Sequence, residues 1–430
     1  MKTGLKGMLA FVLVAVMLLS VCVSAQASSD EKITLRFSWW GSDTRHQATL
    51  QVIDMYMEQN PNVTIEAEYG VFDSFYEKLL TQLAGGTAPD IVSIDYQWTQ
   101  DLIRQGRLFV DMNTLTDKID MTNLDLDLAK SYGSDGDYLI GLAVGVNGLG
   151  YMYNVEFLDR FGITPSDDWT WEDVIENGIK VQEADSSSHL LYNIKNHWTW
   201  MIKAQLKQMN GNPFIKEDLS LGFTREEMIE IFTYIRRLVD TGTVMPFEES
   251  VLYETVYADQ NPDWLNGKIG LFPTSSSHVP AALNATEFEV ATFRFPGTES
   301  TVDSGILVTP AIYLSVYEGS KHVDQAADFI NFFLNDEEAI RVLKDTRSVP
   351  ANSKAKEILL NDNVISSQLV SLLEQASSKP GAPESSYSLN TEVVAVLENY
   401  VQQVGYGMMS PEQATDSMMG ELEIVLSTLN

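Results

Sequence analysis

Residues 33–94 read ITLRFSWWGSDTRHQATLQVIDMYMEQNPNVTIEAEYGVFDSFYEKLLTQLAGGTAPDIVSI. Apolar and polar residues alternate over residues 33–39, which is the period of a strand. From Ser42 or Asp43, apolar residues recur at helical spacing until Asn60 and Pro61 stop the pattern. A second strand at residues 63–69, a helix over residues 75–83 and a short apolar strand at residues 91–94 follow. This β-α-β-α-β order predicts a mainly parallel sheet flanked by helices.

The same stretch also predicts where a ligand would bind. In open parallel sheets, ligands bind just beyond the carboxyl ends of the strands. The loops at these ends are Trp39–Asp43, Tyr69–Ser74 and Asp95–Trp98. We therefore expect the binding residues of this part of the chain to come from these three loops.

The first residues have the pattern of a cleaved export signal. Lys2 and Lys6 precede a nearly unbroken apolar run over 8–23, and Ala25-Gln26-Ala27 offers small residues for cleavage. We therefore predict a signal peptide at residues 1–27 and an exported mature protein in the periplasm or at the outer face of the cytoplasmic membrane. The run is shorter than the roughly 20 residues that a membrane anchor needs.

The only cysteine, Cys22, lies within this predicted signal, so cleavage would leave a mature protein without a thiol or a disulfide. In an alternative interpretation, Leu19-Ser20-Val21-Cys22 is a lipobox and Cys22 becomes a lipidated N-terminus. About 400 residues follow the signal, which favours two domains. The glycine-containing extended segment at residues 138–153 is where we expect the chain to cross between them.

Charge excludes two classes of partner. Without Lys2 and Lys6 the chain has 26 basic and 60 acidic residues, a net charge of about −34. Such a charge repels nucleic acid and anionic lipid surfaces, so we expect neither as a partner.

The chain also lacks the best-marked catalytic motifs. It contains no G-x-S-x-G, H-E-x-x-H, Walker A or C-x-x-C sequence. Its five histidines share no metal-ligand spacing, so we expect no metal and no cofactor. A glycosidase pair of carboxylates need only meet in space, and 60 acidic residues make any choice from sequence arbitrary.

Tryptophans are unevenly placed. All eight lie at or near predicted loops or element ends, several of them beside polar residues: Trp39, Trp40, Trp98, Trp169, Trp171, Trp198, Trp200 and Trp264. A sugar ring has an apolar face that stacks on an aromatic side chain and hydroxyls that need planar donors and acceptors. This pattern favours sugar binding, although we expect Trp169 and Trp171 to serve packing.

Four stretches resemble the family 1 extracellular solute-binding proteins of bacterial ABC importers, the group that includes maltodextrin-binding proteins. They are residues 33–41, residues 75–92, Tyr151-Met152-Tyr153-Asn154 and Thr346-Arg347-Ser348-Val349-Pro350-Ala351. The resemblance covers essentially the whole mature chain. Within the family, Trp39-Trp40-Gly41 followed by residues 45–50 is similar to oligogalacturonide-binding proteins. The chain departs from these at Phe72, where tryptophan is commoner, and at residues 95–98.

The resemblance implies a two-lobed α/β fold of the periplasmic-binding-protein type (class II), with a hinge and an interlobe cleft. After the signal peptide predicted at 1–27, it implies lobe I from 28–145 and 304–346, and lobe II from 146–303 and 347–430. It also implies a monomer that takes an oligosaccharide between closing lobes and delivers it to membrane permease subunits, without catalysis.

The resemblance further assigns roles to single residues. The stacking platforms would be Trp39, Trp40, Phe72, Trp98, Trp198 and Trp200. The hydrogen-bonding residues would be Asp43, Arg45, Asp95, Asn147 and Arg347. Arg45 or Arg347 would be the clamp for a uronate carboxylate.

Three alternatives remain open from the sequence. The same scaffold could bind another solute, such as a glycerol phosphate or a polyamine. The chain could be an exported glycosidase or polysaccharide lyase, since these also line clefts with aromatics and carboxylates. It could also serve as a sensor that docks on a membrane receptor instead of an importer.

Overall fold

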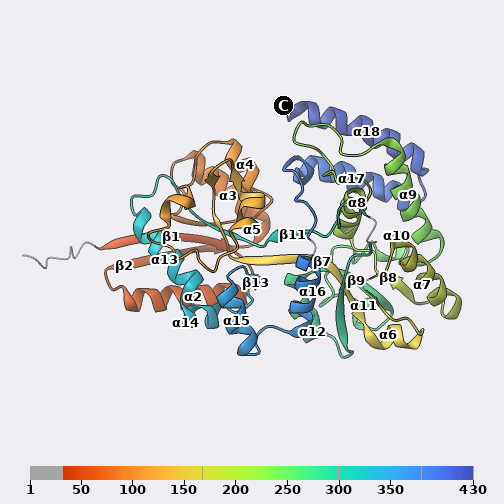
Figure 1. Cartoon of the computed structure of the whole chain (residues 1–430), viewed down its shortest axis with the longest axis horizontal. Helices are drawn as coiled ribbons and strands as arrows, with labels where there is room; N and C mark the ends of the chain where they lie inside the picture. Colours follow the sequence, from red (N-terminus) through yellow and green to blue (C-terminus); the bar gives the residue numbers. More distant parts are fainter. Residues whose placement is uncertain (1–31, 167, 298–300, 379, 430) are drawn as a thin grey trace, which may run out of the picture.

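A computed structural model describes residues 32–166, 168–297, 301–378 and 380–429; the predicted signal peptide and Cys22 lie outside these residues. The chain forms two α/β lobes joined by a narrow waist (Figure 1). Each lobe has its own sheet flanked by helices. The two-lobed α/β fold predicted from the sequence is therefore confirmed.

The sheet of lobe I has the order β2-β1-β3-β12-β6. β1 pairs in parallel with β2 and β3, because helices connect these strands, whereas β12 returns from far along the chain and is antiparallel to β3 and β6. The alternation seen in the sequence places Leu35, Phe37 and Trp39 in the core, all fully buried. The strands are β1 (Ile33–Trp40), β2 (Val63–Gly70), β3 (Ile91–Ile94), β6 (Leu142–Ala143) and β12 (Tyr313–Val316).

The other elements of lobe I surround this sheet (Figure 1). They are α2 (Asp43–Gln59), α3 (Phe72–Ala84), α4 (Thr99–Arg104), η1 (Met112–Leu115), α5 (Leu126–Gly133), the two-stranded β4 (Ser134–Asp135) and β5 (Tyr138–Leu139), α13 (Val323–Asn335) and α14 (Glu337–Leu343).

The sheet of lobe II has the order β10-β7-β9-β8. β7 enters from lobe I and is antiparallel to both of its neighbours, while β8 and β9 are parallel. Its strands are β7 (Gly145–Asn154), β8 (His189–Leu191), β9 (Ile269–Ser275) and β10 (Val290–Arg294). Its helices are α6 (Val155–Arg160), α7 (Trp171–Ala184), α8 (Lys195–Asn210), α9 (Arg225–Asp240), α10 (Phe247–Ser250), α11 (Pro262–Leu265), η2 (Ser276–His278), α12 (Val279–Ala285), α16 (Ser367–Ser378), η3 (Tyr387–Leu389), α17 (Thr391–Gly405) and α18 (Pro411–Thr428).

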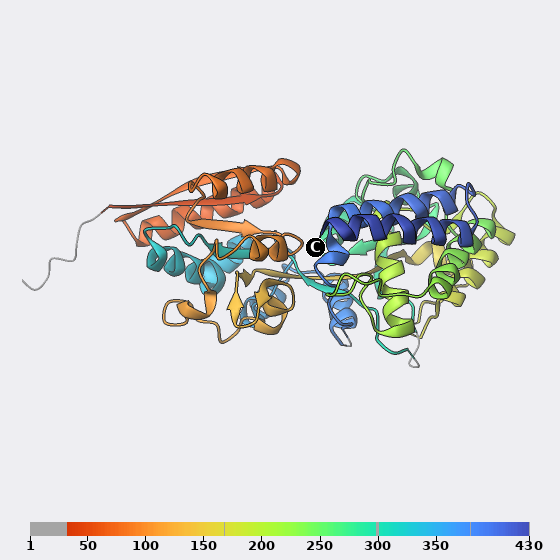
Figure 2. The same ribbon diagram turned by 90° about the horizontal axis from the view of Figure 1, so that it is seen from above.

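The lobes are joined by extended segments that pair with the first half of β7. β11 (Val308–Pro310) and β13 (Val349–Pro350) are both antiparallel to this part of β7, and the view from above shows how slender the connection is (Figure 2). Gly145 permits the close approach of these segments, because a Cβ there would lie 2.1 Å from the carbonyl oxygen of Arg347.

The chain crosses between the lobes for the last time after β13. α15 (Ser353–Asn361) packs on α13 and α14, yet its Ala355 and Leu359 belong to a core cluster shared with α16. The boundaries expected from the sequence, 145/146, 303/304 and 346/347, remain predictions.

Helix ends agree with their sequence signals. Thr224 and Glu227 form a capping box at the start of α9, and Ser410 caps α18. The apolar helical spacing over residues 321–343 is divided between two helices, α13 and α14. Asp336 separates them, because its side chain accepts hydrogen bonds from Glu338 N and Ala339 N and so begins α14.

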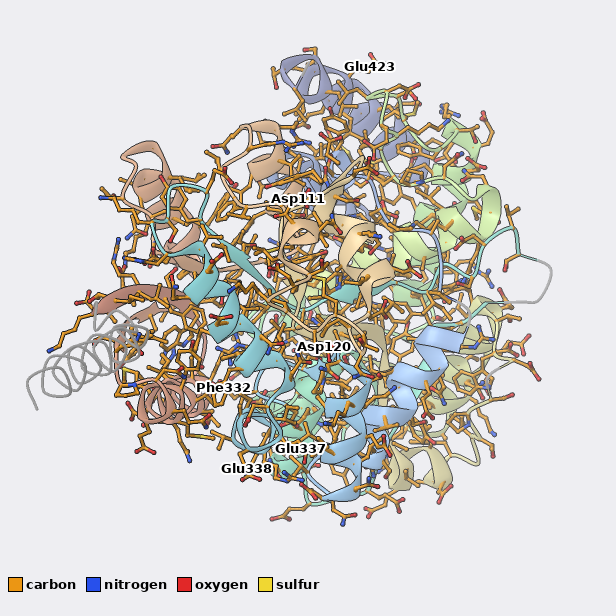
Figure 3. All side chains as sticks on the ribbon, turned by 60° about the vertical axis from the view of Figure 1, so that its left-hand side comes forward. Asp111, Asp120, Phe332, Glu337, Glu338 and Glu423 are labelled. Atoms are coloured by element: carbon orange, nitrogen blue, oxygen red, sulfur yellow. The ribbon has the colours of Figure 1, made fainter. Side chains whose placement is uncertain are left out.

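Acidic side chains are spread over the surface of both lobes. Figure 3 shows Glu337 and Glu338 side by side at one edge of the molecule and Glu423 of α18 at the opposite edge. Among the described residues, no helix is both long and apolar enough to cross a membrane.

Candidate functional site

A cavity of about 460 Å³ lies between the two lobes. Its lobe I wall comes from the loops after β1, β2 and β3, which are the loops that the sheet topology predicts. The segments that join the lobes form its floor, and α8 and α17 form much of the lobe II wall. The cavity thus has walls from both lobes, so a ligand in it would contact both.

Aromatic side chains form one part of the lobe I wall. Trp40 and Phe72 line the cavity, and Phe72 is 41% exposed. Behind them lies Trp98, which stacks on Phe72 with ring centroids 5.2 Å apart and on Tyr76 at 4.6 Å. This backing holds Phe72 as an exposed, supported ring face of the kind that stacks on sugars.

Arg45 is the arginine held most firmly at the cavity. Its Nε donates to Thr346 O at 2.8 Å and its Nη1 to Trp40 O at 3.1 Å. Burial lowers its pKa to about 10, with nearby Asp95 opposing the shift, so the side chain is charged at neutral pH. In the described structure Nη2 has no hydrogen-bonding partner. This nitrogen can therefore donate to an acidic or hydroxylated ligand.

Arg347 has a different environment. It is 4% exposed, its guanidinium lies over the Phe333 ring, and Nη2 donates to Thr49 Oγ1 at 2.7 Å. Its Nε and Nη1 are buried and have no partner among the described residues. Arg347 lines the interlobe cavity and also a small cavity of about 30 Å³ beside Phe333, which is large enough for one water.

Asp95 is the carboxylate of the lobe I wall. It is 8% exposed, and its Oδ1 accepts a hydrogen bond from Gln97 N at 3.0 Å. Burial raises its pKa to about 6, while the hydrogen bonds with Gln97 and the charge of Arg45 oppose this shift. The cavity therefore contains a carboxylate whose pKa of about 6 is well above its ordinary value.

The joining segments present a polar face to the cavity. Asn147, Thr309 and Ser348 line it. The residues next to them in the chain, Val146, Val308 and Val349, line a separate groove, as expected when successive side chains point to opposite faces. Ser348 has a positive φ of 71°, a strained conformation for a residue other than glycine.

One face of α8 forms the centre of the lobe II wall. Asn196, Thr199, Trp200 and Lys203 all line the cavity, and their spacing of i, i+3, i+4 and i+7 places them on one side of the helix. Glu384 and Glu398 extend this wall. Elsewhere on lobe II, Tyr257 and His278 line the cavity with their rings stacked 3.8 Å apart.

The structure brings together in the cavity lining seven residues expected from the sequence: Trp40, Arg45, Phe72, Asp95, Asn147, Trp200 and Arg347. It does not bring Trp39, Asp43, Trp98 or Trp198 into the lining. Alternation along β1 turns Trp39 into the core, where its Nε1 donates to His46 Nδ1. Asp43 is exposed in the first turn of α2, and Trp98 lies behind Phe72.

Trp198 lies two residues before Trp200, so on a helix it points elsewhere. It is 3% exposed, donates to Asn193 Oδ1 at 2.7 Å and stacks on Phe247. The helical periodicity of α8 could have predicted that Trp198 and Trp200 point to different faces of the helix. The same periodicity would have found Thr199 and Lys203, whereas Glu384 comes from a loop that carries no comparable signal.

Among the described residues, no group of three or more His, Cys, Asp or Glu side chains could hold a metal ion. The chemistry of the cavity is instead that of stacking surfaces, two guanidinium groups and buried hydrogen-bonding groups.

Comparisons with known proteins identify the family of this chain. A family model described as bacterial extracellular solute-binding protein matches residues 51–368. An arabinooligosaccharide-binding protein of Bacillus subtilis (strain 168) is 23% identical over 79% of this chain and 79% of its own length.

Solved structures show the same fold. A periplasmic solute binding protein from Pectobacterium atrosepticum aligns with a TM-score of 0.85 at 24% identity, covering 92% of this chain and 99% of that one. A periplasmic oligogalacturonide binding protein from Yersinia enterocolitica, in complex with saturated digalacturonic acid, aligns with a TM-score of 0.81 at 23% identity and the same coverage. The chain belongs to the bacterial extracellular solute-binding protein family.

Proposed function

We propose that this protein captures an oligosaccharide between its two lobes and delivers it intact to an ABC importer. The observation that carries this proposal is the interlobe cavity, which has ring platforms on opposite walls, Trp40 and Phe72 from lobe I and Trp200 from lobe II. Polar side chains lie between them. Apolar ring faces combined with a few convergent polar groups suit a sugar better than a fully charged solute.

The relatives support the same class of ligand. By their names, one relative binds arabinooligosaccharides and one structural neighbour binds oligogalacturonides. The cavity of about 460 Å³ has a size typical of small-ligand sites, and a ligand of two or more sugar units would fit in it.

Within this class we propose a sugar acid as the ligand, with Arg45 as the clamp for its carboxylate. Arg45 lines the cavity, is fixed by two backbone carbonyl oxygens and keeps Nη2 available. A fixed guanidinium loses little freedom on binding a carboxylate. Arg347 adds a second positive charge in the lining.

The remaining parts of the proposal rest on the sequence. The signal predicted at 1–27 would export the protein, and Cys22 would anchor it only if the lipobox interpretation applies. We propose a monomer with membrane permease subunits as partners, because closure of the lobes over the ligand is what an importer of this family reads.

Calorimetric titration of the mature protein with digalacturonic acid, arabinotriose and maltotriose tests the proposal. Saturable binding, with the sugar recovered unchanged, is the expected result. Shortened or unsaturated products would identify an enzyme. The absence of binding to all three sugars would contradict oligosaccharide capture.

A further inference from the structure

Lobe II presents a second polar wall to the cavity, which neither the sequence motifs nor the relatives assign. Thr199 and Lys203 contribute to it from α8, and Glu384 contributes from the segment 380–389 that joins α16 to α17. All three residues are buried, with 7%, 4% and 6% of their surface exposed. A buried polar wall at a ligand cavity is costly unless something satisfies it.

The hydroxyl of Thr199 is the clearest unsatisfied group. Its Oγ1 is buried and has no hydrogen-bonding partner among the described residues. Lys203 is partly satisfied, because its Nζ donates to Ser388 O at 2.8 Å and has two further N–H groups. The wall therefore offers a hydroxyl, ammonium donors and a carboxylate within one cavity.

The charges of this wall differ from those of lobe I. Burial lowers the pKa of Lys203, and the nearby carboxylates of Glu384 and Glu398 oppose that shift. Both carboxylates line the cavity, and each also has a lysine partner, Lys207 and Lys195 respectively. A ligand carboxylate placed here would meet the like charges of Glu384 and Glu398 beside Lys203, whereas Arg45 on the lobe I wall has an N–H group that can pair with it.

We propose that Thr199, Lys203 and Glu384 form a hydroxyl-reading subsite that takes the edge of a neutral sugar ring stacked on Trp200. A ring with adjacent hydroxyls can donate to a carboxylate and accept from an ammonium at the same time. The ligand is thus oriented, with any acidic group toward Arg45 and its neutral hydroxyl edge toward lobe II. This subsite rests on the proposed oligosaccharide function.

Thr199→Val tests the subsite most directly, because valine keeps the shape and removes the unpartnered hydroxyl. Thr415→Val is the matched control: Thr415 of α18 is buried and its Oγ1 has no hydrogen-bonding partner among the described residues, but it does not line the cavity. Affinities for digalacturonic acid, arabinotriose and maltotriose are measured by calorimetry, and folding is checked by circular dichroism.

We expect Thr199→Val to weaken the best-bound sugar about fivefold, and Lys203→Met to weaken it about tenfold or more, while Thr415→Val binds as the wild type does. Wild-type affinity in Thr199→Val overturns the subsite and leaves the proposed function standing. If Lys203→Met does not fold, Thr199→Val alone decides. If the wild type binds none of the three sugars, the proposed function fails, and the subsite fails with it.

Discussion

Lys207 and Glu384 form an ion pair inside lobe II, with Nζ and Oε1 3.0 Å apart and side chains 0% and 2% exposed. Lys207 Nζ also donates to Ala382 O, and Glu384 Oε2 accepts from Phe214 N at 3.1 Å. These bonds fix the segment 380–389 to α8 and to the chain that follows it at Phe214. They hold Glu384 at the cavity wall although it lies in a loop.

We predict that Lys207→Met destabilises the protein by about 3–5 kcal/mol, because it leaves the carboxylate of Glu384 buried without its counter-charge. Urea unfolding measures this free energy. Arg225→Ala, which breaks the exposed pair with Asp416, is the control and should cost less than about 1 kcal/mol. Similar costs for both variants would contradict a dominant role for burial.

Two tryptophans of α8 should behave differently when replaced. Trp198→Ala removes a buried ring that stacks on Phe247 and should lower the free energy of unfolding by about 3–5 kcal/mol. Trp200→Ala removes a half-buried ring that lines the cavity, so sugar affinity should fall about tenfold with a smaller change in stability. Denaturation and calorimetry on both variants separate the two roles, and an equal loss of affinity would contradict this assignment.

The fold of lobe I could be predicted because its information is local. The alternation in β1 and the helical spacing after it gave both the sheet and the three loops that reach the cavity. Trp39 shows the limit of this reasoning. Its position at a strand end suggested a binding residue, but the same alternation that identifies the strand also turns its side chain into the core.

The lobe II wall was harder to predict because it depends on contacts between distant segments. Lys203 and Glu384 are 181 positions apart, and the hydrogen bond from Lys203 to Ser388 O has no sequence signal. The break at Asp336 is also hard to predict, since apolar spacing continues across it while a local side-chain cap ends one helix and begins the next.

Arg45 should decide selectivity for acidic sugars. We expect Arg45→Ala to weaken digalacturonic acid by about tenfold to a hundredfold and arabinotriose by much less, because only the former has a carboxylate to pair. Arg341→Ala is the control, since this exposed arginine of α14 pairs with Glu338 and Asp362, away from the cavity. Repeating the titration at two salt concentrations further checks whether Arg45 and the ligand carboxylate interact through their charges. An equal loss for both sugars would mean that Arg45 only supports the fold through Thr346 and Trp40.

Asp95 should make stability and binding respond to pH. Its pKa is raised to about 6 by burial, above the value of about 3.9 for an unfolded chain. An acid whose pKa is raised on folding contributes stability below about pH 4, and this contribution is lost as the pH rises through about 6. At neutral pH the ionised Asp95 therefore costs stability.

Asp95→Asn keeps an acceptor for Gln97 N and removes the titration. We expect it to match the wild type at pH 4 and to exceed it at pH 7 by up to about 3 kcal/mol in urea unfolding. We also expect it to bind sugar more weakly at pH 7, because a charged acceptor in the cavity is lost. A stability difference that stays constant from pH 4 to pH 7 would exclude titration of Asp95 in this range. A variant that is more stable but binds sugar more weakly would show that the Asp95 carboxylate contributes to ligand binding and lowers the free energy of unfolding.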